Sequence, residues 1–125
     1  MSMGKTRPCR IAITAALLCL AAGQGHAQTA VPATLADAQK ALQAADASLN
    51  AIWKRCTEPA STTVQSIAAM RSAQLLWPKY RDMNARAYQL GQSSRRPLDD
   101  VYYVHAQTLM TLDRATELKL LFGCN

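Results

Sequence analysis

The feature that most constrains the fold is a stripe of apolar residues, spaced alternately three and four apart, in segment 35–56. Its members are Leu35, Ala38, Leu42, Ala45, Leu49, Ile52 and Cys56. This spacing places them on one side of an α-helix, which must then be buried against other helices. Thr34 is a suitable N-cap with Asp37 three residues later, and Pro59 disfavours helical backbone at Glu58. The segment therefore predicts one helix of a bundle.

Two more segments carry helical periodicity. Segment 61–90 is apolar over a wide face, which favours a helix packed between two others. Its apolar positions include Ile67, Ala69, Met70, Ala73, Leu76, Trp77, Tyr80, Met83, Ala87 and Leu90. Pro78 removes one backbone hydrogen bond, so we expect a bend there, with two shorter helices as the alternative.

A loop over 91–97 separates the second helix from the third. Asp99 is the expected N-cap and Gly123 the expected C-terminal stop. The inner face of this helix is expected to hold Val101, Val104, His105, Thr108, Leu112, Ala115, Leu118 and Phe122. No strand shows convincing alternation. The chain is therefore expected to be all-α, an antiparallel three-helix bundle whose central helix is kinked near Pro78.

The beginning of the chain resembles a targeting signal more than a folded segment. Its basic residues are Lys5, Arg7 and Arg10. A short apolar run over 11–22 follows, and a small-x-small pattern ends at Ala27, which together predict a secretory signal peptide over 1–27. A retained anchor and lipidation at Cys19 are the alternatives. We expect a flexible leader over 28–33 and one domain over 34–125, in a periplasmic or secreted protein.

Removal of the signal changes both the charge and the cysteine count. The net charge falls from +6 to +3, because 11 basic residues then face 8 acidic ones. No basic run exceeds two residues, so nucleic-acid binding is not expected. Cys56 and Cys124 remain, and an even count in an oxidising compartment predicts one disulfide. In an up-down-up bundle the first and third helices end at the same pole, so this pairing is geometrically reasonable.

The residues assemble no catalytic site. His105 is the only histidine left after cleavage, and we interpret it as an inner-face residue. Neither a Ser/His/Asp nor a Cys/His set is present, and the adjacent Asp99 and Asp100 suit a helix start better than paired acid-base catalysis. The sequence therefore predicts a protein that is not an enzyme, with no catalytic, cofactor-binding or metal site.

Three blocks of the chain support a family resemblance. Residues 46–53 resemble a "D-x-x-LN-x-x-Y" opening with Trp53 in place of the tyrosine. Residues 74–82 resemble a central "Q-x-x-W-x-x-[YF]-R-D", and residues 112–118 resemble a closing "L-x-x-R-x-x-E-L" with one residue fewer before the arginine. In this order the blocks are similar to those of the LprI-like lysozyme-inhibitor family.

The resemblance implies a small, exported, mainly helical protein of the bacterial envelope. Its signature residues, which we interpret as mostly structural, are Trp77, Tyr80, Arg81, Asp82, Arg114 and Glu117. Arg81 is expected to pair with Asp82, Glu117 or Asp113. Family members usually carry a cysteine after the Arg-Asp pair and another in the third helix. This chain lacks both, so its predicted disulfide would be a replacement.

The family's namesake activity is inhibition of lysozyme. We therefore expect an envelope protein that acts by binding a protein, with a lysozyme-type muramidase as the candidate partner. The alternative is a periplasmic structural or stress-related interaction protein without lysozyme activity. Arg95 and Arg96, in the loop, are the candidate partner-binding residues, because two arginines suit the two carboxylates of a muramidase cleft.

Overall fold

The computed structural model describes residues 30–58, 62–93 and 99–124, which form three helices and, within those ranges, no strand. The helices are α1 (Leu35–Cys56), α2 (Val64–Ser93) and α3 (Asp100–Phe122). The prediction of an all-α three-helix bundle is confirmed. The expected signal peptide and the candidate residues Arg95 and Arg96 lie outside the described residues.

Most helix ends follow the local signals in the sequence, but α2 continues to Ser93. The prediction of a loop from residue 91 is therefore wrong by three residues, because a single glycine, Gly91, does not stop a helix. The hydroxyl of Thr34 caps α1 by accepting a hydrogen bond from the Asp37 backbone N–H at 3.1 Å. The Asp99 carboxylate caps α3 in the same way through the Val101 N–H at 2.9 Å. Gly123 ends α3 with φ of 64°, in the left-handed region where glycine has no Cβ penalty.

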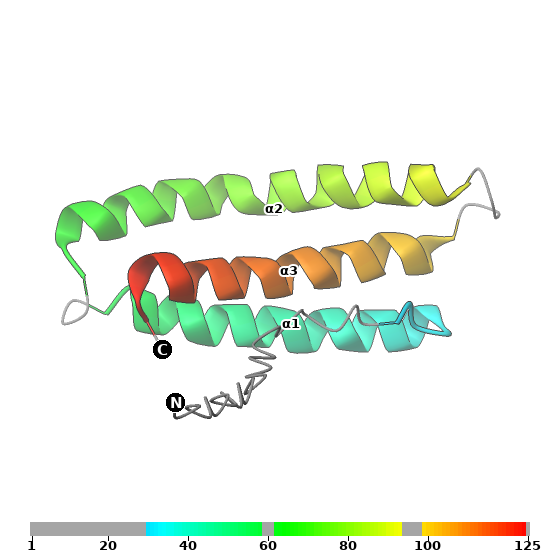
Figure 1. Cartoon of the computed structure of the whole chain (residues 1–125), viewed down its shortest axis with the longest axis horizontal. Helices are drawn as coiled ribbons and strands as arrows, with labels where there is room; N and C mark the ends of the chain where they lie inside the picture. Colours follow the sequence, from blue (N-terminus) through cyan, green and yellow to red (C-terminus); the bar gives the residue numbers. More distant parts are fainter. Residues whose placement is uncertain (1–29, 59–61, 94–98, 125) are drawn as a thin grey trace, which may run out of the picture.

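The middle of the bundle is occupied by α3. It lies between α2 and α1 and packs against both (Figure 1), whereas α1 and α2 make no close backbone approach in the described part of the chain. The expectation that the second helix is packed between two others is therefore wrong. Periodicity shows that apolar residues share one side of a helix, but it does not show how many neighbouring helices cover that side.

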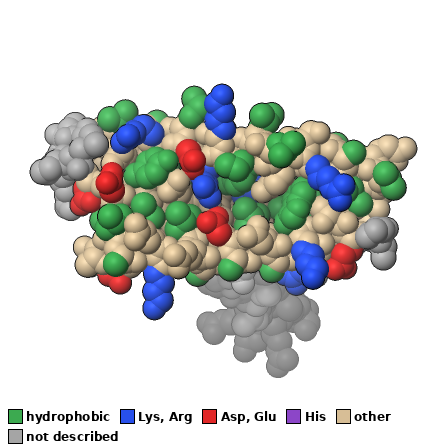
Figure 2. Space-filling model, turned by 180° about the vertical axis from the view of Figure 1, so that it is seen from behind, with side chains coloured by type: hydrophobic (Ala, Val, Ile, Leu, Met, Phe, Trp, Pro, Cys, Tyr) green, Lys and Arg blue, Asp and Glu red, His purple; other side chains and the backbone are tan. Residues whose placement is uncertain are grey.

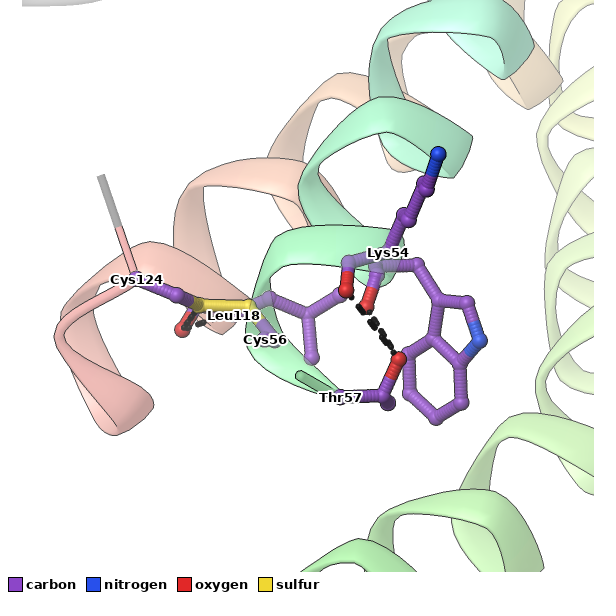
Figure 3. Close-up of a disulfide and its surroundings, with 6 residues drawn as sticks. Lys54, Cys56, Thr57, Leu118 and Cys124 are labelled. Atoms are coloured by element: carbon purple, nitrogen blue, oxygen red, sulfur yellow. Dashed lines mark hydrogen bonds between the residues drawn. A yellow bond between two sulfur atoms is a disulfide. The ribbon is translucent and has the colours of Figure 1, made fainter. Parts of the chain in front are cut away.

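The larger of the two core clusters lies at the pole of the bundle that contains the disulfide, and all three helices contribute to it. Its buried members are Leu49, Ile52, Cys56, Met70, Ala115, Leu118 and Cys124, with Trp53, Trp77 and Phe122 packed against them. Cys56 and Cys124 are bonded, with 5.1 Å between their Cα atoms, which confirms the predicted pair. Figure 3 shows the bridge joining the ends of α1 and α3 beside Leu118. A second cluster nearer the other pole contains Ala38, Val101 and Val104.

Two features of α2 bear on the predictions. It runs unbroken through Pro78, so one long helix rather than two short ones is confirmed; the bend at Pro78 stays a prediction. None of the described helices is both long enough and apolar enough to cross a membrane.

Candidate functional site

A polar network joins the three helices near their midpoints. Arg81 of α2 donates from Nη1 to Asp46 of α1 at 3.2 Å and from Nε to Asp82 at 3.0 Å. Gln107 of α3 donates to the same Asp82 oxygen at 2.7 Å. Arg81 is well covered, with 17% of its side chain exposed, whereas 44% of each carboxylate side chain remains exposed. The expected Arg81–Asp82 pair is present, and the network connects the three helices.

The remaining signature residues gather at the contact between α2 and α3. The Arg114 guanidinium lies over the Trp77 ring at 5.7 Å and donates to Glu117 at 2.7 Å. Tyr80 lies beside Trp77, with 5.7 Å between ring centroids. The Trp77 Nε1 and Arg114 Nε atoms are buried and have no hydrogen-bond partner in the described residues. Glu117 pairs with Arg114, and Arg81 pairs with Asp46 in addition to the expected Asp82.

The position of Tyr80 corrects one sequence interpretation. We expected Tyr80 to lie on the packed apolar face of the second helix, yet Tyr80 is 57% exposed. Trp77 contacts Arg114 of α3 and Arg81 pairs with Asp46 of α1, whereas the Tyr80 side chain extends toward solvent. Met83, another position of that predicted apolar face, is likewise exposed.

The outer side of α2 carries a continuous apolar line, which we call the outer stripe. It consists of Ala69, Ala73, Leu76, Tyr80, Met83, Ala87 and Leu90, all exposed. The four large members are between 53% and 70% exposed. The sequence showed these positions as apolar, and the fold leaves them in solvent because α3 covers only the opposite side of α2.

A groove of about 850 Å³ runs between α1 and α2, with α3 contributing its remaining wall. Its lining residues are Leu35, Gln39, Lys79, Asp82, Met83, Arg86, Asp100, Tyr103 and Val104. Arg86 lies over the Tyr103 ring at 5.8 Å. Figure 2, which views the molecule from behind, shows hydrophobic side chains interspersed with both signs of charge across that face. Sequence reasoning missed this groove, because no local motif encodes it.

His105 lies on the inner side of α3, as expected, and is 4% exposed. It lines a small cavity with Thr108 of its own helix and with Ala30 and Pro32, which precede α1. Burial lowers the pKa of His105 below its ordinary value, since the charged form loses its hydration. No group of three or more metal-binding side chains occurs among the described residues.

The fold and its surfaces together define a class: a small disulfide-bonded helical bundle with an open groove and an exposed apolar helix face. Such features are typical of proteins that contact other macromolecules.

Comparison with known families gives the particular assignment. The model of the lysozyme inhibitor LprI family matches residues 19–118, so the chain belongs to that family. The resemblance carried by the three sequence blocks is thereby confirmed. No curated protein matches the chain, and no solved structure matches it either.

Proposed function

We propose that this chain is an exported, non-enzymatic protein that binds and inhibits a lysozyme-type muramidase. Membership of the LprI family supports the partner class. The disulfide between Cys56 and Cys124 supports export, since such bonds persist in oxidising compartments. The same proposal includes cleavage after Ala27, a flexible leader over 28–33 and one domain over 34–125.

The groove between α1 and α2 is the observation that supports this proposal, and we propose it as the binding surface for the partner. Its volume of about 850 Å³ accommodates several side chains of a protruding partner segment. Leu35, Met83 and Val104 supply apolar contact area, and charged side chains of both signs surround them. Mixed charges fix the orientation of a partner more than they attract it from a distance.

Arg95 and Arg96 belong to the proposed surface as additional contacts. They lie in the segment that connects the end of α2 to Asp100, and Asp100 lines the groove. Their guanidinium groups would form charge-assisted hydrogen bonds with the carboxylates of a muramidase cleft.

A lysis assay tests the activity. The protein, purified from the periplasm of an expression host, is titrated into a muramidase lysing bacterial cells. Inhibition that saturates near equimolar protein is the expected result. Unchanged lysis at a large molar excess would remove the inhibitor proposal and favour the envelope interaction protein without lysozyme activity, whose partner a pull-down from envelope extract would then capture.

Two matched variants test the surface. Gln39→Trp fills the groove from an exposed position on α1 and is expected to weaken inhibition at least tenfold. Gln43→Trp places the same side chain one turn further along α1, where the residue is exposed and does not line the groove. Equal inhibition by both variants would exclude the groove. Undiminished inhibition by a protein carrying Arg95→Ala and Arg96→Ala would exclude the loop.

A further inference from the structure

The outer stripe of α2 has the spacing of a coiled-coil seam. Its residues are alternately four and three apart over 69–90, and none is charged. Such spacing keeps seven positions on one line of a helix, and knobs on that line fit holes on a facing helix. The stripe is exposed, so the bundle itself does not use this seam.

The sizes of the stripe residues allow two copies of α2 to pack against each other in antiparallel orientation. When two copies of α2 run antiparallel with Tyr80 opposite Met83 of the second copy, Leu76 falls opposite Ala87. In the next layer Ala73 falls opposite Leu90. Large residues thus meet small ones in the outer layers, as close packing requires, and the two central layers pair a thioether with an aromatic ring, a favourable contact.

We propose that two copies of this protein associate through the outer stripe, with their α2 helices antiparallel and Tyr80 packed on Met83 of the second copy. Burying the stripe removes roughly 1,000 Å² from water over both copies, given the apolar area of large side chains. That area lies at the low end of specific interfaces, so a dissociation constant on the order of 10–100 µM is expected. The inference does not rest on muramidase binding, but Lys79, Met83 and Arg86 also line the groove, so a second copy and a groove-bound partner would compete for them.

The charges along the edge of the stripe add a signature. Lys79 and Arg86 directly precede Tyr80 and Ala87, two residues that begin three-residue steps of the stripe, and this heptad position flanks the seam. In the antiparallel register the helix position of Lys79 in one copy is next to that of Arg86 in the other. The Arg86 guanidinium is held against Tyr103 and Gln89 of its own copy, and the two positive charges repel across the seam, a repulsion that the symmetry repeats. Salt screens like charges at a surface, so dimerisation is expected to strengthen as salt rises. Lys79→Glu converts both repulsions into attractions.

Sedimentation velocity on the periplasmically purified protein tests the inference, with far-UV circular dichroism confirming that each variant is folded. Leu76→Glu is expected to weaken dimerisation more than tenfold. Leu75→Glu is the matched control, because Leu75 is an even more exposed leucine on the same helix, at 83% against 70% for Leu76, and lies off the stripe. It is expected to dimerise like the unmodified protein. Lys79→Glu is expected to dimerise more tightly, most of all at low salt.

Several results would overturn the inference. A monomer at concentrations near 1 mM would show that the stripe does not self-associate. Equal losses in Leu75→Glu and Leu76→Glu would place the contact elsewhere. Weaker dimerisation in Lys79→Glu would exclude the antiparallel register. Binding of the unmodified protein to anionic vesicles, lost in Leu76→Glu, without dimerisation in solution would instead assign the stripe to a membrane surface.

Discussion

Arg81 of α2 contacts Asp46 of α1 although these two helices make no close backbone approach, with 3.2 Å between Nη1 and Oδ1. The guanidinium also holds Asp82, which in turn accepts a hydrogen bond from Gln107 of α3. One side chain therefore helps to connect all three helices at their midpoints.

The two ends of this contact are expected to differ in their effect on stability. Arg81→Ala should lower the free energy of unfolding by about 2 kcal/mol, because it removes two charge-assisted hydrogen bonds from a covered position. Asp46→Ala should cost about 1 kcal/mol or less, since Arg81 keeps Asp82 and the lost carboxylate was half exposed. Urea unfolding of both variants measures the difference, and equal losses would contradict the proposed centre of the network.

The disulfide is expected to contribute more than any single side-chain contact. Cys56 and Cys124 are 68 residues apart in sequence, and the chain-entropy estimate for closing such a loop is about 4 kcal/mol. A protein carrying Cys56→Ala and Cys124→Ala should lose about that amount. Comparing its urea midpoint with that of the oxidised protein checks this, and a loss below about 1 kcal/mol would show that the unfolded chain is little constrained by the bridge.

Trp77 offers a test of its unpaired indole N–H. Trp77→Phe keeps an aromatic ring under Arg114 and removes a buried donor that has no partner in the described residues, so we expect a change within about 1 kcal/mol. Trp77→Ala should cost about 2–3 kcal/mol, below the loss for a fully buried tryptophan, because Trp77 is half-buried. Thermal unfolding of both variants measures the contrast. A large loss in Trp77→Phe would reveal a hydrogen bond to the indole.

His105 should make stability depend on pH. Its folded pKa is lowered by burial, so below about pH 6.5, the ordinary value, the unfolded chain takes up a proton more readily than the folded one. Neutral His105 therefore costs no stability above that pH, and the free energy of unfolding falls as the pH drops from there toward the folded pKa. Unfolding at pH 7.5 and 5.5 should show this loss, and His105→Gln should reduce it. An unchanged slope in the variant would exclude His105 as the cause.

Much of the fold was predictable because its causes are local. The stripe 35–56, the caps Thr34 and Asp99, and the stop at Gly123 act over three or four residues, so they are visible in the chain. The Cys56–Cys124 pair was also predictable, because two cysteines remained and the connectivity puts two helix ends at one pole.

The sequence by itself therefore determined the number of helices, the caps of α1 and α3, the disulfide and the family blocks. Only the tertiary structure decided that α3 is the middle helix, that Arg81 reaches Asp46, that Tyr80 faces solvent, and that a groove opens between α1 and α2. The physical reason is that an apolar helix face specifies burial without specifying a neighbour. Which faces of α2 are covered depends on the packing of all three helices at once.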